Sequence, residues 1–242
     1  MHHNPGRYAG NIGPIPLMAI ACAALLMAGN AAFSHGIGGQ DAAFVAGTRG
    51  PDLIPFMYLG AKHMVTGYDH LLFIFGVIFF LYRLRDVILY VTLFSLGHSI
   101  TLLAGVLLRI DVNAYLVDAV IGLSVAYKAF DNLGGFKSVF GVQPDNRVAV
   151  ATFGLIHGFG LATKLQALRL NANGLIPNMI GFNIGVELGQ FIALAVMLAV
   201  MLVWRRTASF ERSSVAANAL ILMAGFVLME YQLAAYFIGT KA

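Results

Sequence analysis

Six long apolar runs follow the first 34 residues, and short segments that hold most of the charged side chains separate them. Each run approaches or exceeds the roughly 20 residues that a helix needs to span a membrane. The apolar positions do not alternate with a period of two, and the runs are about twice as long as a transmembrane strand, so the pattern predicts helices and excludes a β-barrel. The predicted helices lie near Pro55–Tyr82, Val87–Leu108, Ala114–Phe130, Val148–Leu168, Ile176–Trp204 and Val215–Ile238.

Composition fixes the class of protein. Hydrophobic residues make up 59% of the 242 residues and charged residues only 11%, whereas a soluble domain carries about 25% charged residues. A soluble enzyme is therefore excluded, and the sequence predicts an all-α, polytopic helix bundle with six transmembrane helices in a lipid bilayer. The 15 Lys and Arg residues are scattered between the apolar runs, which is typical of orientation signals and gives no indication of nucleic-acid binding.

Residues 1–34 have the pattern of a cleavable signal peptide. A single arginine precedes a short apolar core at Ile15–Ala28, and Ala32-Phe33-Ser34 has the small-x-small form of a cleavage site. Cleavage would leave residues 35–242 as the six-helix domain and His35 at its N-terminus, where the amine and the imidazole together can chelate a metal. The alternative is an uncleaved first helix.

The basic residues favour one orientation of the predicted spans. With a cleaved signal peptide and six spans, both termini lie in the periplasm of a bacterial inner-membrane protein. The predicted cytoplasmic loops then hold seven basic residues and the outer segments hold five, a bias in the direction of the positive-inside rule. The seven are Arg83, Arg85, Lys137, Arg147, Arg205, Arg206 and Arg212, and the five are Arg49, Arg109, Lys164, Arg169 and Lys241.

Ionisable side chains occupy the first five predicted spans, where a charge costs about 2.5–3.5 kcal/mol on insertion scales and commonly marks a functional site. The candidate metal ligands are His63, Asp69, His70, His98, His157 and Glu187, with His35, Asn183, Gln190 and Asp118 as weaker candidates. Plainer interpretations stay open. Each single histidine could be a hydrogen-bonding strut, Asp118 could pair with Arg109, and Lys128 could pair with Asp131.

The spacing predicts a site assembled between helices. In a continuous helix His63 and His70 share a face but lie about 10 Å apart along the axis, too far for one ion with metal–nitrogen bonds of about 2.0–2.1 Å. His63 is therefore expected to be one station and Asp69 with His70 another. His98, His157 and Glu187 are expected at the depth of the second station. In the fifth span a polar stripe adjoins a small-residue stripe suited to tight helix contact, formed by Asn183, Glu187 and Gln190 and by Gly181, Gly185 and Gly189.

The available ligands limit the metal. The only cysteine, Cys22, lies within the predicted signal peptide, so the remaining chain offers no thiolate. Imidazole with carboxylate suits divalent nickel, cobalt, zinc, manganese or iron and does not suit Cu(I).

The segments that carry these residues resemble the HupE/UreJ family of bacterial membrane proteins, in particular its larger, second branch. The stretch from His63 to His70 has the H-x5-D-H form of that family, while Asp118 and Leu161 replace the Glu and Phe that are usual there. The resemblance implies a cleaved signal peptide, six spans and a role as a secondary permease for nickel or cobalt, with His63, Asp69 and His70 handling the metal. The matching segments are Gly60–His63, Gly67–Phe73, Gly97–Leu102, Phe153–Gly160 and Phe182–Gln190.

The sequence therefore favours a divalent metal permease that is not an enzyme, with nickel or cobalt as substrate. An intramembrane metal-dependent hydrolase is the first alternative, since such a metal can keep a water position open and Ser99 or Glu187 could assist. The second alternative is a structural or assembly subunit of the membrane. A homo-oligomer or a metallochaperone partner is compatible with all three.

Overall fold

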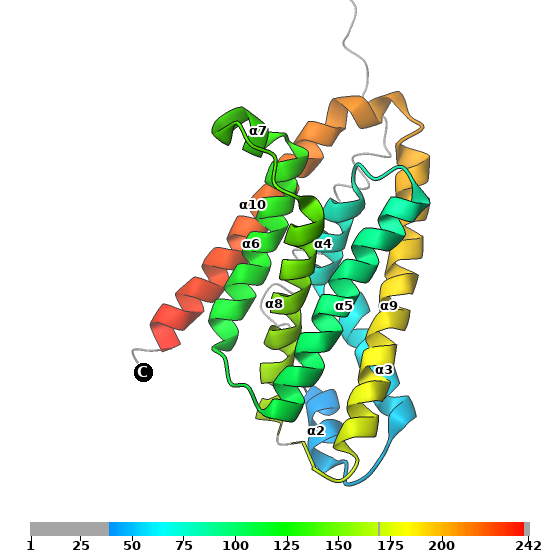
Figure 1. Ribbon diagram of the computed structural model, residues 1–242, viewed down its shortest axis with the longest axis vertical. Helices are drawn as coiled ribbons and strands as arrows, with labels where there is room; N and C mark the ends of the chain where they lie inside the picture. Colours follow the sequence, from blue (N-terminus) through cyan, green and yellow to red (C-terminus); the bar gives the residue numbers. More distant parts are fainter. Residues whose placement is uncertain (1–38, 169, 240–242) are drawn as a thin grey trace, which may run out of the picture.

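The computed structural model describes residues 39–168 and 170–239, and every regular element of these residues is a helix (Figure 1). The predicted signal peptide and His35 lie outside the described residues. The all-helical prediction is confirmed, and the helix bounds fall within a few residues of most predicted runs. The helices are α2 (Gly39–Gly47), α3 (Leu53–Thr66), α4 (Tyr68–Ile78), α5 (Leu84–Leu108), α6 (Ala114–Asn132), α7 (Gly135–Phe140), α8 (Asn146–Ala167), α9 (Leu175–Trp204) and α10 (Ala208–Gly239).

Four of the described helices, α5, α8, α9 and α10, are individually long and apolar enough to cross a membrane. Helix α6 has a comparable length, but Asp118, Lys128 and Asp131 lower its hydropathy. Helices α3 and α4 are each short, and they follow one another through the two halves of the bundle (Figure 1). The chain is thus a multi-pass membrane protein.

The first predicted span is not one continuous helix, because the helix breaks at Gly67. The backbone of this residue is extended (φ −75°, ψ 96°). Its N–H closes α3 on the carbonyl of His63 at 2.9 Å, and its carbonyl accepts from Leu71 at 3.0 Å to begin α4. A Cβ at this position would lie 3.0 Å from the Nδ1 atom of His70. A larger residue at the break would therefore crowd the neighbouring imidazole.

Glycines allow α3 and α9 to pack backbone against backbone. A Cβ on Gly185 would overlap the carbonyl oxygen of Met57, and a Cβ on Gly60 would overlap that of Phe182. A Cβ on Gly189 would lie 2.7 Å from the carbonyl of Ala61. The predicted small-residue stripe of the fifth span is thus a close helix contact, as expected where apolar side chains alone give no drive for association in lipid.

Close backbone contact at glycines also joins two further helix pairs. In the α5–α8 pair, a Cβ on Gly158 would overlap the carbonyl of His98, and one on Gly154 would overlap that of Phe94. In the α6–α10 pair, Gly225 faces the backbone of Ala126. These three pairs are the most extensive helix contacts of the described residues, and α6 and α10 lie side by side in Figure 1.

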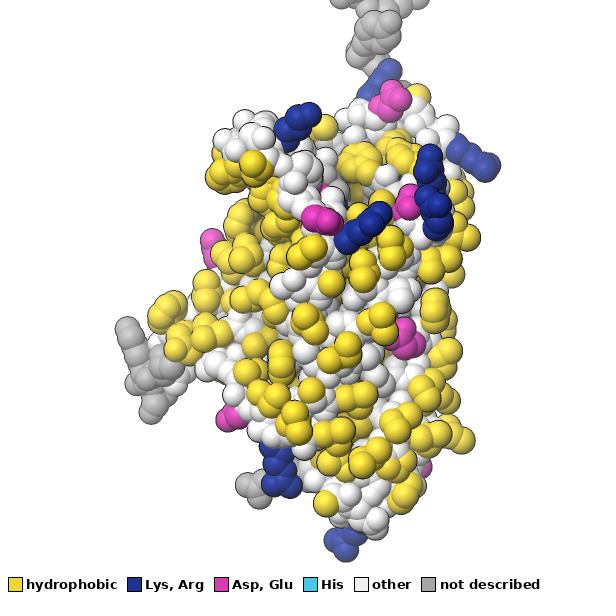
Figure 2. All heavy atoms as spheres, viewed as in Figure 1, with side chains coloured by type: hydrophobic (Ala, Val, Ile, Leu, Met, Phe, Trp, Pro, Cys, Tyr) yellow, Lys and Arg dark blue, Asp and Glu magenta, His cyan; other side chains and the backbone are white. Residues whose placement is uncertain are grey.

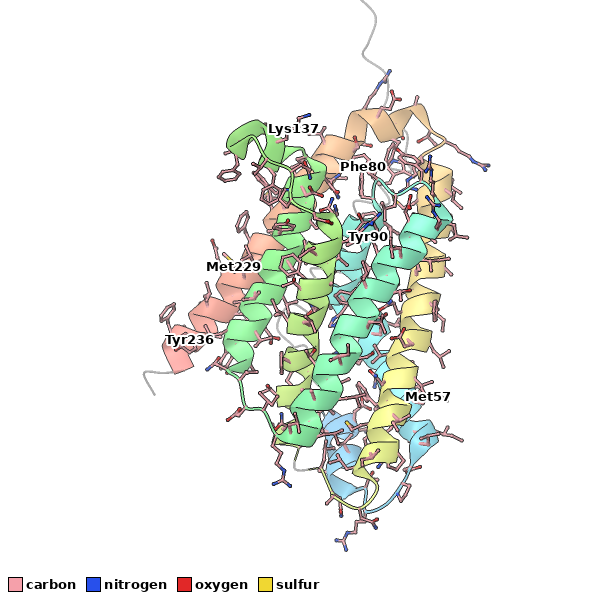
Figure 3. All side chains as sticks on the ribbon, in the orientation of Figure 1. Met57, Phe80, Tyr90, Lys137, Met229 and Tyr236 are labelled. Atoms are coloured by element: carbon pink, nitrogen blue, oxygen red, sulfur yellow. The ribbon has the colours of Figure 1, made fainter. Side chains whose placement is uncertain are left out.

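Basic side chains gather at one end of the bundle, where α4 leads into α5 and α9 leads into α10 (Figure 2). Phe80 and Lys137 lie at this end, while Met57 and Tyr236 lie in the other half (Figure 3). The surface between the two ends is largely apolar on the face drawn in Figure 2. This distribution is that of a bundle with a lipid-facing belt.

Arg205, at the junction of α9 and α10, binds the C-terminal end of α4. Its Nη1 donates to the carbonyl of Leu81 at 2.9 Å, and its Nη2 donates to the carbonyls of Phe79 (2.7 Å) and Ile78. These carbonyls lie at and just beyond the end of α4, where the helical hydrogen bonds stop; that of Ile78 also accepts from the backbone N–H of Leu81 at 3.0 Å. The guanidinium also lies 4.6 Å from the ring centre of Tyr82. The pKa of Arg205 is lowered from its ordinary value because the guanidinium is partly buried, and the charge of Tyr82 opposes this shift.

We expect Gly185→Ala to lower the melting temperature of the detergent-solubilised protein, because overpacking of this kind costs about 1–3 kcal/mol. Gly47→Ala is the matched control, since a Cβ there would meet nothing within 4 Å. Equal melting temperatures of the two variants would contradict the backbone contact between α3 and α9.

Arg205→Ala should also lower the melting temperature, since a hydrogen bond to a charged group contributes about 1.5–3 kcal/mol. Arg205→Lys keeps the charge but lacks the forked donors, so it should recover only part of the loss. Arg206, the exposed neighbour, provides the control in Arg206→Ala. A melting temperature of Arg205→Ala as high as that of Arg206→Ala would show that the hydrogen bonds of Arg205 contribute nothing to stability.

Candidate metal-binding site

Four imidazole rings from four helices meet in the interior of the bundle. The ring centre of His70 on α4 lies 5.3 Å from that of His63 on α3, 5.7 Å from that of His98 on α5 and 5.0 Å from that of His157 on α8. His70, His98 and His157 are almost fully buried, with 3%, 1% and 1% of their surfaces exposed. We call these four residues the histidine cluster, and His70 is its centre.

The expected separation of His63 and His70 into two stations is wrong. That expectation assumed a continuous helix, whereas the break at Gly67 redirects the chain between the two residues. His63 therefore joins the same cluster. A helix break of this kind leaves no mark in the hydropathy pattern, because the apolar run continues through it.

Asp69 holds His70 in place. The Oδ1 atom of Asp69 accepts from the backbone N–H of His70 and lies 2.8 Å from its Nδ1. Because a carboxylate only accepts, Nδ1 must carry the ring proton, and the lone pair of the neutral ring is then on Nε2. This Nε2 is buried and has no hydrogen-bond partner among the described residues.

A backbone carbonyl is the acceptor at His157, where Nδ1 lies 2.7 Å from the carbonyl oxygen of Phe153. Nδ1 is therefore protonated there as well. His98 differs, since neither of its buried ring nitrogens has a hydrogen-bond partner within the described part of the chain. Leaving a buried polar group unpaired costs about 1–3 kcal/mol, so a hydrogen-bonding strut is a poor description of His98.

Phenyl rings line the cluster. The ring of Phe94 lies 4.9 Å from that of His157, and the ring of Phe73 lies 5.5 Å from it. Phe182 on α9 lies 6.2 Å from His63. The imidazoles are thus enclosed by apolar groups that offer no competing ligand. The sequence analysis did not single out these rings, although Phe73 at i+3 from His70 and Phe94 at i−4 from His98 share the helix faces of the histidines.

The distances from His70 to each of the other three rings match the separation of two ligands of one ion, but the four rings do not form a ligand set. An imidazole centre lies about 3.2 Å from a metal bound through nitrogen, so two rings on a tetrahedral ion are about 5 Å apart. However, no three His, Cys, Asp or Glu side chains of the described residues are grouped so that they could hold a metal ion as they stand. Binding therefore requires ring rotation, which costs no hydrogen bond at His98.

The polar stripe of α9 lies against α5 beside the cluster. The Nε2 atom of Gln190 donates to the Oγ atom of Ser95 at 2.6 Å, and the Oγ atom of Ser99 donates to Glu187 at 3.4 Å. Glu187 therefore contacts the residue that follows His98, instead of joining the rings as expected. The Oδ1 atom of Asn183 is buried without a hydrogen-bond partner in the described residues. Ser95 and Ser99, which the sequence reasoning did not place at this contact, make this polar seam between α5 and α9.

Asp118 makes an ion pair that the sequence did not predict. Its carboxylate lies 2.7 Å from the Nζ atom of Lys164 on α8, where pairing with Arg109 was one possibility. Arg109 instead ends α5 in a left-handed conformation (φ 52°, ψ 46°). The predicted pair of Lys128 with Asp131 is confirmed.

The comparisons with known proteins place the chain in a family. A family profile described as HupE / UreJ protein matches residues 39–240, and the chain belongs to this family. Its members are associated with nickel or cobalt transport or with the maturation of urease and hydrogenase. No curated protein and no solved structure shows significant similarity to the chain.

If Asp118 serves structure and not metal, Asp118→Asn should lower the melting temperature, because it breaks a partly buried ion pair and leaves the charge of Lys164 without its carboxylate. Nickel binding by the purified protein should remain at the level of the unmodified chain. Lys164→Met in the Asp118→Asn background should restore part of the stability. Loss of nickel binding at an unchanged melting temperature would instead make Asp118 a ligand.

Proposed function

We propose that this protein is a secondary permease for a divalent transition metal, with nickel or cobalt as its substrate, in the bacterial inner membrane. The observation that carries the proposal is the histidine cluster, in which four helices contribute one imidazole each to the interior of the bundle. Buried ionisable groups in a membrane are costly and commonly mark an ion pathway. The family association with nickel and cobalt supports the same conclusion.

The proposed topology has six spans, with α3 and α4 together forming the first. The end of the bundle that carries Arg83, Arg147 and Arg206 faces the cytoplasm by the positive-inside rule. Residues 1–34 are removed as a signal peptide, and both ends of the remaining chain are periplasmic. The substrate then reaches the cluster from the side of α2 and leaves toward the basic end.

Nitrogen ligands favour the proposed substrates. Imidazole suits nickel, cobalt and zinc, whereas magnesium and calcium prefer oxygen. The four rings are neutral when they bind metal, so the adjacent Asp69 supplies the nearest negative charge and Glu187 the next along the α5–α9 seam. A divalent ion that moves inward gains about 4.6 kcal/mol per 100 mV of membrane potential.

Release of the ion requires the ligand set to change, and the helix pairs suggest how. His63 belongs to the α3–α9 pair, whereas His98 and His157 belong to the α5–α8 pair. Helices α3 and α9 contact each other far more extensively than they contact α4 or α5. A shift of the α3–α9 pair, with the break at Gly67 as its pivot, would withdraw His63 from the other three rings. The polar seam of Ser95, Ser99, Glu187 and Gln190 would have to part during this movement.

The hydrolase alternative is less well supported by the geometry. It requires Ser99 or Glu187 to act beside the metal, and these two side chains are hydrogen-bonded to each other on the α5–α9 seam. The two nitrogens of His98, which have no hydrogen-bond partner among residues 39–168 and 170–239, likewise favour a ligand over a purely structural subunit.

The test is uptake of radioactive nickel and cobalt by cells that express the full chain. We expect accumulation above empty cells, and its loss by at least about tenfold in His70→Ala and His98→Ala, since ligand or outer-shell losses of this kind cost 10–100-fold. His98→Gln separates loss of the ligand from loss of packing. Glu187→Ala should reduce uptake, while Glu230→Ala, at an exposed glutamate of α10, should not.

Membrane expression of every variant must be equal. Absence of uptake by well-expressed unmodified protein would overturn the permease. Normal uptake by His70→Ala would overturn the placement of its site.

A further inference from the structure

We infer that Asp69 is a positioning residue that acts through His70, and that the metal is bound by ring nitrogens of the cluster, among them Nε2 of His70 and of His157, and by no carboxylate. The inference rests on the proposed function, and it assigns Asp69 a role different from that of a ligand. It also defines the site as one of nitrogen ligands, whereas the candidate residues included both imidazoles and carboxylates.

The hydrogen bonds of Asp69 carry the inference. One carboxylate oxygen, Oδ1, serves both the backbone N–H and the Nδ1–H of His70, each at 2.8 Å. Asp69 is 3% exposed and stands in the first turn of α4, where the helix dipole favours a negative charge. Coordination of a metal through Oδ1 would break the bond that orients the central ring of the cluster.

A second ring shows the same arrangement with a different acceptor. The Nδ1–H of His157 donates to the carbonyl oxygen of Phe153 at 2.7 Å. In both rings the proton is fixed on Nδ1, so the lone pair is on Nε2. Metal-binding histidines almost always donate their other ring N–H to a carboxylate or a backbone carbonyl, which fixes the tautomer and raises the basicity of the ligand. His70 and His157 each satisfy this pattern before any ion is bound.

Gly67 makes the arrangement possible. A Cβ on Gly67 would lie 3.0 Å from the Nδ1 of His70 and 3.2 Å from the Oδ1 of Asp69. The helix break and the carboxylate–imidazole bond therefore occupy the same small space. His98, whose two nitrogens have no hydrogen-bond partner in the described residues, is the ring that can turn toward an ion without losing a bond.

The test uses the purified full-length protein in detergent with Co²⁺ as the probe, because its visible absorption reports the number and type of ligands. Asp69→Asn should weaken Co²⁺ binding by about 10–100-fold, the usual effect of an outer-shell loss. Its spectrum at saturation should nevertheless match that of the unmodified protein. His70→Ala, which removes a ligand, should shift the spectrum, and Glu230→Gln should change neither property.

Three results would overturn the inference. A saturated Asp69→Asn spectrum that shifts as that of His70→Ala does would make Asp69 a ligand. Unchanged affinity in Asp69→Asn would remove its role altogether, and an unmodified protein that binds no Co²⁺ would remove the site. Failure of uptake alone would overturn the permease function and leave the assignment of Asp69 standing. The uptake test and the Co²⁺ test therefore distinguish failure of the proposed function from failure of this inference.

A second measurement needs no variant. The unmodified protein, labelled with ¹³C at its aspartate carboxyl carbons and loaded with Cu²⁺ as the probe, can be studied by pulsed electron paramagnetic resonance. We expect only weak ¹³C coupling, from a carboxyl carbon beyond the coordination sphere. Strong coupling, as from a directly bound carboxylate, would overturn the inference.

Discussion

Backbone contact at glycines is the constraint on which the rest of this structure depends. In lipid, apolar side chains gain little by leaving their surroundings for one another, so helices associate where their backbones can approach closely. Gly60 and Gly185 permit this between α3 and α9, and Gly154 and Gly158 permit it between α5 and α8. Each close pair then fixes the height of the histidines that its helices carry. Gly158 itself faces the carbonyl of His98, so the packing contact and the cluster share one residue.

The helix break at Gly67 adds His63 to the rings that the close helix pairs position. A continuous helix would separate His63 and His70 by about two turns, and only three rings could then meet. The break brings the fourth ring to the centre without lengthening or bending any other span. It also creates the N-terminus of α4 beside the cluster, and Asp69 is placed there. The break at Gly67 thus influences both the number of rings that meet and the position of the carboxylate, which in turn fixes the tautomer of His70.

Much of the fold and part of the site could be predicted from the sequence. Hydropathy located the long helices, and rare intramembrane histidines identified His70, His98 and His157. The break at Gly67 could not be predicted, because a glycine in an apolar run is compatible with a straight helix. The partners of Glu187 and Asp118 could not be predicted either. Depth along a span follows from residue counting, whereas the direction in which a side chain points depends on how each helix is rotated in the bundle.

The phenyl rings around the histidine cluster have a consequence for ions that are never bound. Phe73, Phe94 and Phe182 offer no oxygen or nitrogen that could replace a lost water molecule. For the substrate that we propose, arrival at the imidazoles therefore requires shedding of the hydration shell. Magnesium dehydrates reluctantly and is poorly matched to nitrogen ligands, so the loss of its water beside these phenyl rings would not be offset by the imidazoles. Discrimination against magnesium would then begin with dehydration, beside phenyl rings that themselves bind no metal.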